Sequence, residues 1–275
     1  MTQIKSLVKI GLIAFILALT SALWAKYIAT QWFASDASVE LNTDFADKLN
    51  SIVTSNPLSL FLPGAGEISS SSGKIKKKLL SRPFLLNLEN KYLLLPEIYS
   101  KDWNKLQNEW KGGNVKDIED LRAYLSKNLY VEDDIKSGFV DISILTENKY
   151  LSQKILSALI DGINSFEKEK FKISANKVIS AATDKLNKKN NTSFNNETYS
   201  RLIETESRKL LLSETQDDYY LKVLDPPNLA KFKAKPKARS YFIVTFALSF
   251  GFIVLYQNRK KIFELIKNDI LGRNS

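Results

Sequence analysis

The sequence lacks two residue types that carry much of enzyme chemistry. Among its 275 residues there is no histidine and no cysteine. Without histidine, Ser–His and Cys–His catalytic arrangements and histidine metal sites are excluded. Without cysteine, disulfides, thiol nucleophiles and thiolate metal sites are excluded too. The missing cysteine does not identify a cellular compartment.

Other catalytic signatures are equally scarce. No GxxxxGK[ST] motif is present, which excludes a nucleotide-binding loop of that type, and the glycine pair Gly112-Gly113 is not followed by one. Neighbouring acids at 132–134 and 217–218 could in principle serve acid–base roles. Adjacent acids usually form solvated surface instead. We therefore predict a protein that is not an enzyme, with no catalytic residue, no metal and no cofactor.

The sequence does contain two uncharged apolar runs, one near each end. Residues 10–25 and 241–256 form these runs of 16 residues, and about two hundred residues without a comparable run separate them. As a helix, each run spans about 24 Å, and its flanks extend it toward the ~30 Å hydrocarbon core of a bilayer. We predict two transmembrane helices, within residues 10–32 and 240–258, the first ending in an interfacial aromatic belt. A buried helix of a soluble protein and, for the first run, a cleaved secretory signal are the alternatives.

Positive charge gathers at the two ends of the chain. Residues 1–32 carry +3 and residues 231–275 carry +8, whereas residues 33–230 carry −1. This distribution argues against nucleic-acid binding, which needs basic residues on the folded domain, and favours anionic lipid headgroups as partners.

Lys5 and Lys9 precede the first run, and Asp36 and Glu40 follow it. At the first span the positive-inside rule then favours cytoplasmic ends at 1–9 and 259–275 and places the domain over 33–239 outside the cytoplasm. The basic residues on the two sides of the second span match, so the rule favours neither orientation there.

Small residues recur along both runs at three- or four-residue steps. They are Gly11, Ala14, Ala18, Ala22 and Ala25 in the first run, and Ala247 and Gly251 in the second. Small side chains let helix backbones approach closely in lipid. The spacing therefore predicts a helix–helix packing seam on each span.

Between the runs, the apolar periodicity is mixed. It predicts strands over 34–41, 140–144 and 217–224, and helices over 43–53, 75–93, 117–129, 149–189 and 197–213, with a breaker-rich loop over 56–72. The helical stretch over 75–93 is expected to break at Pro83 or beyond. No proline interrupts residues 149–189, so this helix would be about 60 Å long. A helix of that length projects from its domain or packs against partners. The predicted fold is an α+β domain with a long projecting helical hairpin, flanked by two transmembrane helices.

The order of these features resembles the Wzz-type chain-length determinants, also called polysaccharide co-polymerases. Short motifs agree with the resemblance: Ser81-Arg82, Pro226-Pro227, Pro236 beside basic residues, Gly251 in the second run, and the segment 161–164 with the sequence Asp-Gly-Ile-Asn. The family usually has more prolines at regular spacing before its second span. The resemblance covers essentially the whole chain.

The resemblance implies an inner-membrane protein of bacteria whose periplasmic domains assemble as a ring of identical subunits. Such proteins set the chain length of a surface polysaccharide, such as O-antigen, while a separate polymerase makes the bonds. The implied partners are further copies of the chain, that polymerase, membrane lipids and a lipid-linked glycan. We expect neighbouring hairpins to pack side by side through Ile155 and Leu159. The alternatives are a membrane-anchored periplasmic adaptor of an export system and a sensory ectodomain.

Overall fold

The computed structural model describes residues 2–42, 71–134, 136–187, 193–216, 218–257 and 259, with side chains described from Ile10 onward. The chain divides into two compact units. The terminal unit comprises Met1–Phe33 and Phe232–Ser275, and the central unit comprises Ala34–Lys231. The predicted helix over 43–53, most of the loop over 56–72, and the tail beyond residue 259 lie outside the described residues.

The terminal unit consists of helices α1 (Thr2–Tyr27) and α9 (Ala238–Gln257) with the segments that lead to them. Within them, Ile10–Tyr27 and Ala238–Tyr256 each have a mean hydropathy of 1.7 and are long and apolar enough to cross a membrane. Most of their side chains are exposed, whereas a helix in the core of a soluble protein is largely buried. Where the chain leaves the helices, Trp32 and Lys235 form an antiparallel bridge, with a 2.9 Å bond from Trp32 N to the Lys235 carbonyl.

The predicted packing seam is confirmed on α1 at Ala14, Ala18 and Ala25 but not at Gly11, where an added Cβ would meet nothing within 4 Å, and it is wrong on α9. Ala14, Ala18 and Ala25 are fully buried in the terminal unit. On α9, however, Ala247 is exposed, and a Cβ added to Gly251 would meet nothing within 4 Å. The face of α9 that meets α1 instead carries larger groups, because Thr245 Oγ1 lies 2.9 Å from Ser21 Oγ and the Phe242 ring lies 5.6 Å from that of Phe15. Small residues on α1 alone give the close approach.

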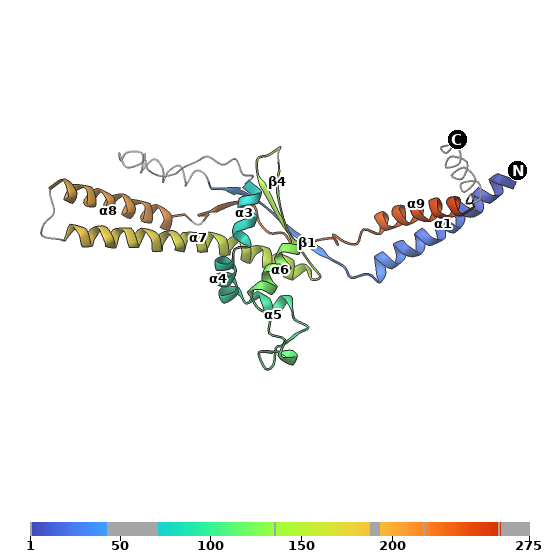
Figure 1. The fold of residues 1–275 in the computed structure, drawn as a ribbon, viewed down its shortest axis with the longest axis horizontal. Coiled ribbons are helices and arrows are strands. Elements are labelled where there is room, and N and C mark those ends of the chain that lie inside the picture. The colour runs from blue at the N-terminus through green and yellow to red at the C-terminus, as the bar shows by residue number, and fades with distance from the viewer. Residues whose placement is uncertain are drawn as a thin grey trace, which may run out of the picture. The chain divides into compact units, whose positions relative to one another are not determined.

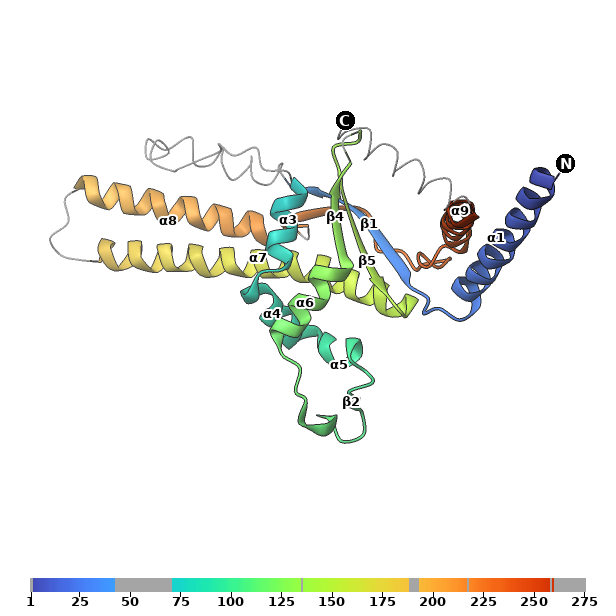
Figure 2. The same ribbon diagram turned by 45° about the vertical axis from the view of Figure 1, so that its right-hand side comes forward.

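The central unit is built on a sheet with strand order β4-β5-β1-β6 (Figure 2). The strands are β1 (Phe33–Leu41), β4 (Leu129–Asp133), β5 (Val140–Thr146) and β6 (Leu221–Asp225). β1 pairs antiparallel with β6, from Ser38 opposite Asp225 to Leu41 opposite Leu221, and β4 pairs antiparallel with β5. The first and last strands of the unit are therefore neighbours.

The strands near residues 34–41 and 140–144 are confirmed, and the third strand begins later than predicted. β6 begins at Leu221 and not near residue 217. The reason is that Leu221 lies opposite Leu41, the last residue of β1, so the residues before Leu221 have no residue of β1 opposite them. β4 was not predicted as a strand, because only one of its five residues is buried, so it carries little alternation.

Short helices complete the central unit. They are α3 (Ser71–Leu79), α4 (Arg82–Tyr92), α5 (Leu94–Ile98) and α6 (Ile118–Asn128), with a small hairpin of β2 (Trp103–Asn104) and β3 (Glu109–Trp110) and a 3-10 turn, η2 (Lys111–Gly113). α3 and α6 contact the sheet at β4 and β5, whereas α4 and α5 pack on α7 (Lys149–Leu186).

The helical stretch predicted over 75–93, with a break at Pro83 or beyond, is indeed two helices, α3 and α4, but the break lies at residues 80–81, before Pro83. Pro83 lies in the first turn of α4, where its missing N–H costs nothing and its fixed φ suits the helix. Asp117 begins α6 with a capping box, within the range predicted for this helix.

The long helix and its return are confirmed. α7 (Lys149–Leu186) has 38 residues, about 57 Å at 1.5 Å per residue, and α8 (Ser193–Glu214) lies beside it (Figures 1 and 2). The first half of α7 packs into the central unit, whereas beyond Asn164 only Ala175 and Ala182 of this helix are buried. The two helices therefore form a hairpin that projects from the unit's core.

Candidate functional site

The segment Asp161-Gly162-Ile163-Asn164 joins three elements of the central unit. A Cβ added to Gly162 would lie 2.8 Å from Leu88 Cδ1 and 3.4 Å from Phe84 Cε2, so α4 approaches the backbone of α7 closely at this point. Ile163 is fully buried in the core. Gly162, which has no side chain, is therefore the position that lets α4 approach.

Asn164 connects α7 to the start of β6. Its Oδ1 accepts hydrogen bonds from Tyr220 N at 2.9 Å and Leu221 N at 2.7 Å, and its Nδ2 donates to the Leu221 carbonyl at 2.9 Å. The side chain is nearly buried, with 7% exposure. One amide therefore satisfies three main-chain groups at the base of the projecting hairpin.

A charged and aromatic cluster adds a second connection at this base. Lys78 Nζ of α3 lies 3.0 Å from Glu167 Oε2 of α7 and 3.9 Å from the centre of the Tyr220 ring. Burial, reinforced by the negative charge of Glu167, raises the pKa of both Tyr219 and Tyr220 to about 12. The two phenols stay neutral at physiological pH, so the cluster has the character of a structural contact between α3, α7 and β6.

The motif residues of the resemblance do not form one site. Ser81 is the N-cap of α4 without a side-chain cap bond, and Arg82 Nε lies 3.8 Å from Glu119 Oε1 at an exposed surface. Pro226 and Pro227 follow β6, where the Pro227 carbonyl accepts a 3.0 Å bond from Gln153 Nε2 of α7. Ser81 and Arg82 therefore lie at the start of α4, and Pro226 and Pro227 lie just after the end of β6.

The remaining motif residues, Pro236 and Gly251, belong to the terminal unit. Pro236 follows a cis peptide bond with Lys235 and lies directly before α9. Gly251 lies within α9 and is partly exposed. Both positions are thus associated with the second apolar helix.

Ile155 and Leu159 do not lie on the surface of the hairpin. Both side chains are fully buried in the core cluster of the central unit. Their apolar spacing marks the face of α7 that packs into its own domain. A charged substitution there therefore tests the folding of the central unit.

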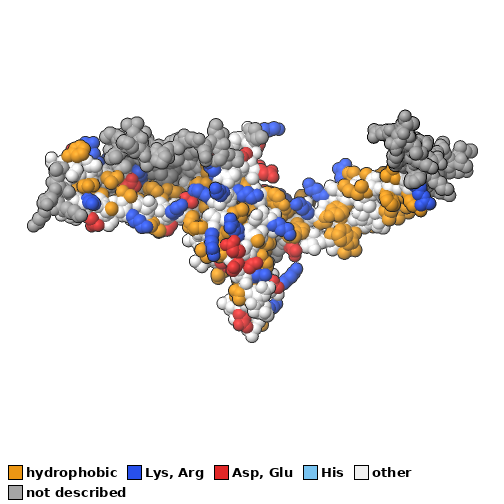
Figure 3. Space-filling view, in the orientation of Figure 1, with side chains coloured by type: hydrophobic (Ala, Val, Ile, Leu, Met, Phe, Trp, Pro, Cys, Tyr) orange, Lys and Arg blue, Asp and Glu red, His pale blue; other side chains and the backbone are white. Residues whose placement is uncertain are grey.

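The distal hairpin carries exposed apolar side chains. Ile173 on α7 is 50% exposed, and Phe194 and Leu211 on α8 are 74% and 64% exposed. Ser213 is the one buried residue among the described side chains of α8. The charged side chains of α8 largely pair within the helix, for example Glu197 with Arg201 at 2.6 Å. Figure 3 shows hydrophobic side chains on the hairpin between these charges, a pattern suited to packing against other helices.

The neighbouring acids have local structural roles in the described part of the chain. Asp133 accepts bonds from both N and Oγ of Ser72, at 2.9 and 2.6 Å. Asp134 accepts a 2.6 Å bond from Ser137 Oγ, which lowers the pKa of this carboxyl. Among the described residues, no group of three or more carboxylates could hold a metal ion. Asp217 lies outside the described residues.

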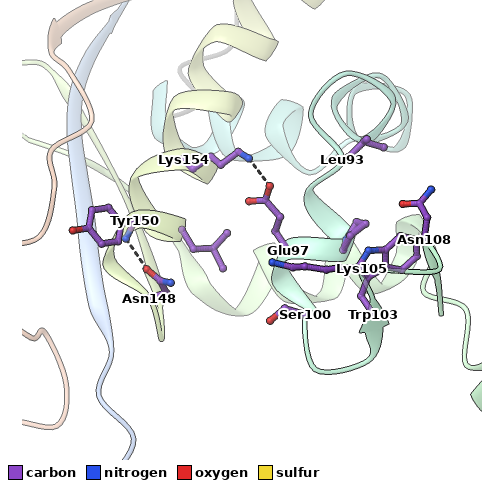
Figure 4. Close-up of a pocket in the computed structure, with 11 residues that line it drawn as sticks. Leu93, Glu97, Ser100, Trp103, Lys105, Asn108, Asn148, Tyr150 and Lys154 are labelled. Carbon is purple, nitrogen blue, oxygen red and sulfur yellow. Dashed lines mark hydrogen bonds and ion pairs between the residues drawn. The ribbon is translucent and has the colours of Figure 1, made fainter. Parts of the chain in front are cut away.

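One cavity in the central unit was not predicted. It lies between α5, the β2–β3 hairpin and the first turns of α7 (Figure 4). Its lining comes from residues 93–108 and 148–154, which are distant in sequence and match no motif. The pair Trp103 and Trp110, whose rings lie 4.8 Å apart, is the one sequence signal that could have drawn attention to this region.

Comparisons with known proteins give structural similarity without detectable sequence relatives. No protein-family model and no curated protein matches the sequence. A full-length bacterial polysaccharide co-polymerase is similar in structure, with a TM-score of 0.34 and 12% identity, over 93% of this chain and 95% of that one. A fragment of WzzB, a polysaccharide co-polymerase from Salmonella Typhimurium, gives a TM-score of 0.34 and 14% identity, over 75% of this chain and 100% of that one.

Proposed function

We propose that this chain is a non-enzymatic, oligomeric scaffold of the bacterial inner membrane. In this role it regulates the chain length of a surface polysaccharide, O-antigen or a related glycan, which a separate polymerase synthesises. Its two apolar helices cross the membrane, with both termini in the cytoplasm and the central unit in the periplasm. Its partners are copies of itself, the polymerase, membrane lipids and the growing lipid-linked glycan.

The observation that carries this proposal is the projecting hairpin on a domain tethered at both ends. The hairpin exposes Ile173, Phe194 and Leu211, and Ser213 is the one fully buried residue among the described side chains of α8. Because isolated apolar surface is costly in water, such a hairpin gains stability by packing against copies of itself. The element order of span, strand, long helix, return strand, Pro226-Pro227 and second span also follows the order that the resemblance rests on.

Deleting the gene tests the function directly. We expect the banding of the surface glycan on a gel to lose its preferred length, while total glycan synthesis continues because the polymerase is a separate protein. Complementation with the unaltered chain restores the original distribution. An unchanged distribution in the deletion strain would favour the export adaptor or the sensory ectodomain.

The absence of cysteine makes the topology testable without removing any native thiol. Leu106, which is 98% exposed in the central unit, provides a site for a single Leu106→Cys substitution. We expect a membrane-impermeant maleimide to label this variant in intact spheroplasts. The matched Asn274→Cys variant, in the C-terminal tail, should react only after the membrane is permeabilised. The opposite pattern of labelling would place the central unit in the cytoplasm and contradict the proposal.

A further inference from the structure

We propose that the cavity between α5, the β2–β3 hairpin and the first turns of α7 binds a carboxylate-bearing sugar residue. The inference rests on the function proposed above and names the class of glycan that the chain would recognise. The cavity has a volume of about 660 Å³, within the ~300–1,000 Å³ of typical small-molecule sites. All of its lining residues belong to the central unit.

The charges around the cavity favour an anionic ligand. Its charged lining residues are Glu97, Lys105 and Lys154, which gives one positive charge in excess. Glu97 and Lys154 form an ion pair with each other, as Figure 4 shows. Among the described residues, Lys105 has no hydrogen bond or ion pair, so its ammonium group is the one uncompensated charge in the lining. A ligand carboxylate would form a charge-assisted hydrogen bond with it.

The neutral polar groups of the lining favour a ligand rich in hydroxyl groups. Asn148 Oδ1 accepts the 2.9 Å bond from Tyr150 N that begins α7, which fixes the side chain and leaves its NH₂ group to donate. Asn108, held at a φ of 54°, and Ser100 place a second amide and a hydroxyl on the same cavity. These groups both donate and accept, which suits sugar hydroxyls better than it suits a simple anion.

An aromatic ring completes the site. Trp103 lines the cavity, and its indole is held edge-on against Trp110, with ring centres 4.8 Å apart and planes inclined by 71°. The contact fixes the ring in place before a ligand arrives, so little conformational freedom is lost on binding. A flat apolar face beside hydrogen-bonding groups matches a pyranose, which has a C–H face and an equatorial rim of hydroxyls.

Calorimetry on the full chain in lipid nanodiscs tests the proposal with three probes: methyl glucuronide, methyl glucoside and acetate. We expect saturable binding of the glucuronide, with affinity at least about tenfold above that of the glucoside or acetate, since one charge-assisted contact distinguishes them. Equal affinity for glucuronide and glucoside would overturn the acidic-sugar assignment. Acetate binding as tightly as the glucuronide would show a simple anion site, and no saturable binding would overturn the proposal altogether.

Variants locate the binding in this cavity. Lys105→Met should weaken glucuronide binding about tenfold and leave glucoside binding unchanged, since only the carboxylate contact is lost. Lys177 is an exposed lysine on the distal part of α7. Lys177→Met is therefore the matched control and should change the affinity for neither the glucuronide nor the glucoside. Equal effects of the two substitutions would overturn the assignment. A changed glycan distribution in the deletion strain together with absent binding would refute this inference alone, whereas an unchanged distribution would refute the proposed function.

Discussion

Replacing Ile155 with Asp is expected to unfold the central unit and not merely to separate the copies of the proposed assembly. The side chain is fully buried in the apolar cluster that α4, α7 and the sheet share. A carboxylate there would be buried without a partner, and such changes cost more than about 4 kcal/mol, a large part of the stability of a domain. Limited proteolysis and thermal unfolding of the detergent-solubilised chain would show rapid cleavage and loss of the cooperative transition.

The same substitution at Ile173 is the matched control. Ile173 lies on the same helix but is 50% exposed on the distal hairpin, so an Asp there stays solvated in the monomer. We expect Ile173→Asp to keep the unfolding transition within about 0.5 kcal/mol of the native chain and to reduce the size of the assembly measured by light scattering. A folded Ile155→Asp variant, or an Ile173→Asp variant that retains the native size, would contradict this assignment of faces.

The contrast between Ile155 and Ile173 shows how far helical periodicity can be read from sequence. The pattern predicted the long helix and its return, because both faces of α7 follow helical spacing. It could not distinguish the face of α7 that is buried in its own domain, at Ile155, from the face that stays exposed, at Ile173, since both are apolar. That distinction depends on where α4 and the sheet meet the helix, which is long-range information.

The same limit explains the other differences. Pro83 predicted a break in the helix. A proline can follow the end of one helix or lie in the first turn of the next, and the turn at Leu80 and Ser81 shows that Pro83 belongs to the start of α4. On α9, Ala247 and Gly251 had the spacing of a packing seam, yet α1 contacts Phe242 and Thr245. The cavity beside Trp103 joins two segments about 45 residues apart, and no local pattern brings them together.

The sheet and the hairpin depend on one another through Asn164, which was noted in the sequence only as part of a motif. Because β6 is the edge strand beside β1, the main-chain groups at its start need partners from outside the sheet. Asn164 supplies them from α7. The segment that returns from the hairpin is thus fixed to the helix that leaves the domain.

Asn164→Ala is therefore expected to lower the free energy of unfolding of the central unit by about 2–4 kcal/mol. Three hydrogen bonds are lost, and buried main-chain groups left without partners each cost about 1–3 kcal/mol when they cannot reach water. Asn187→Ala, at the exposed end of the same helix, is the control and should change the value by no more than about 0.5 kcal/mol. Denaturant unfolding of the full chain in detergent measures both. Equal losses in the two variants would mean that the bonds from Asn164 do not hold β6 against α7.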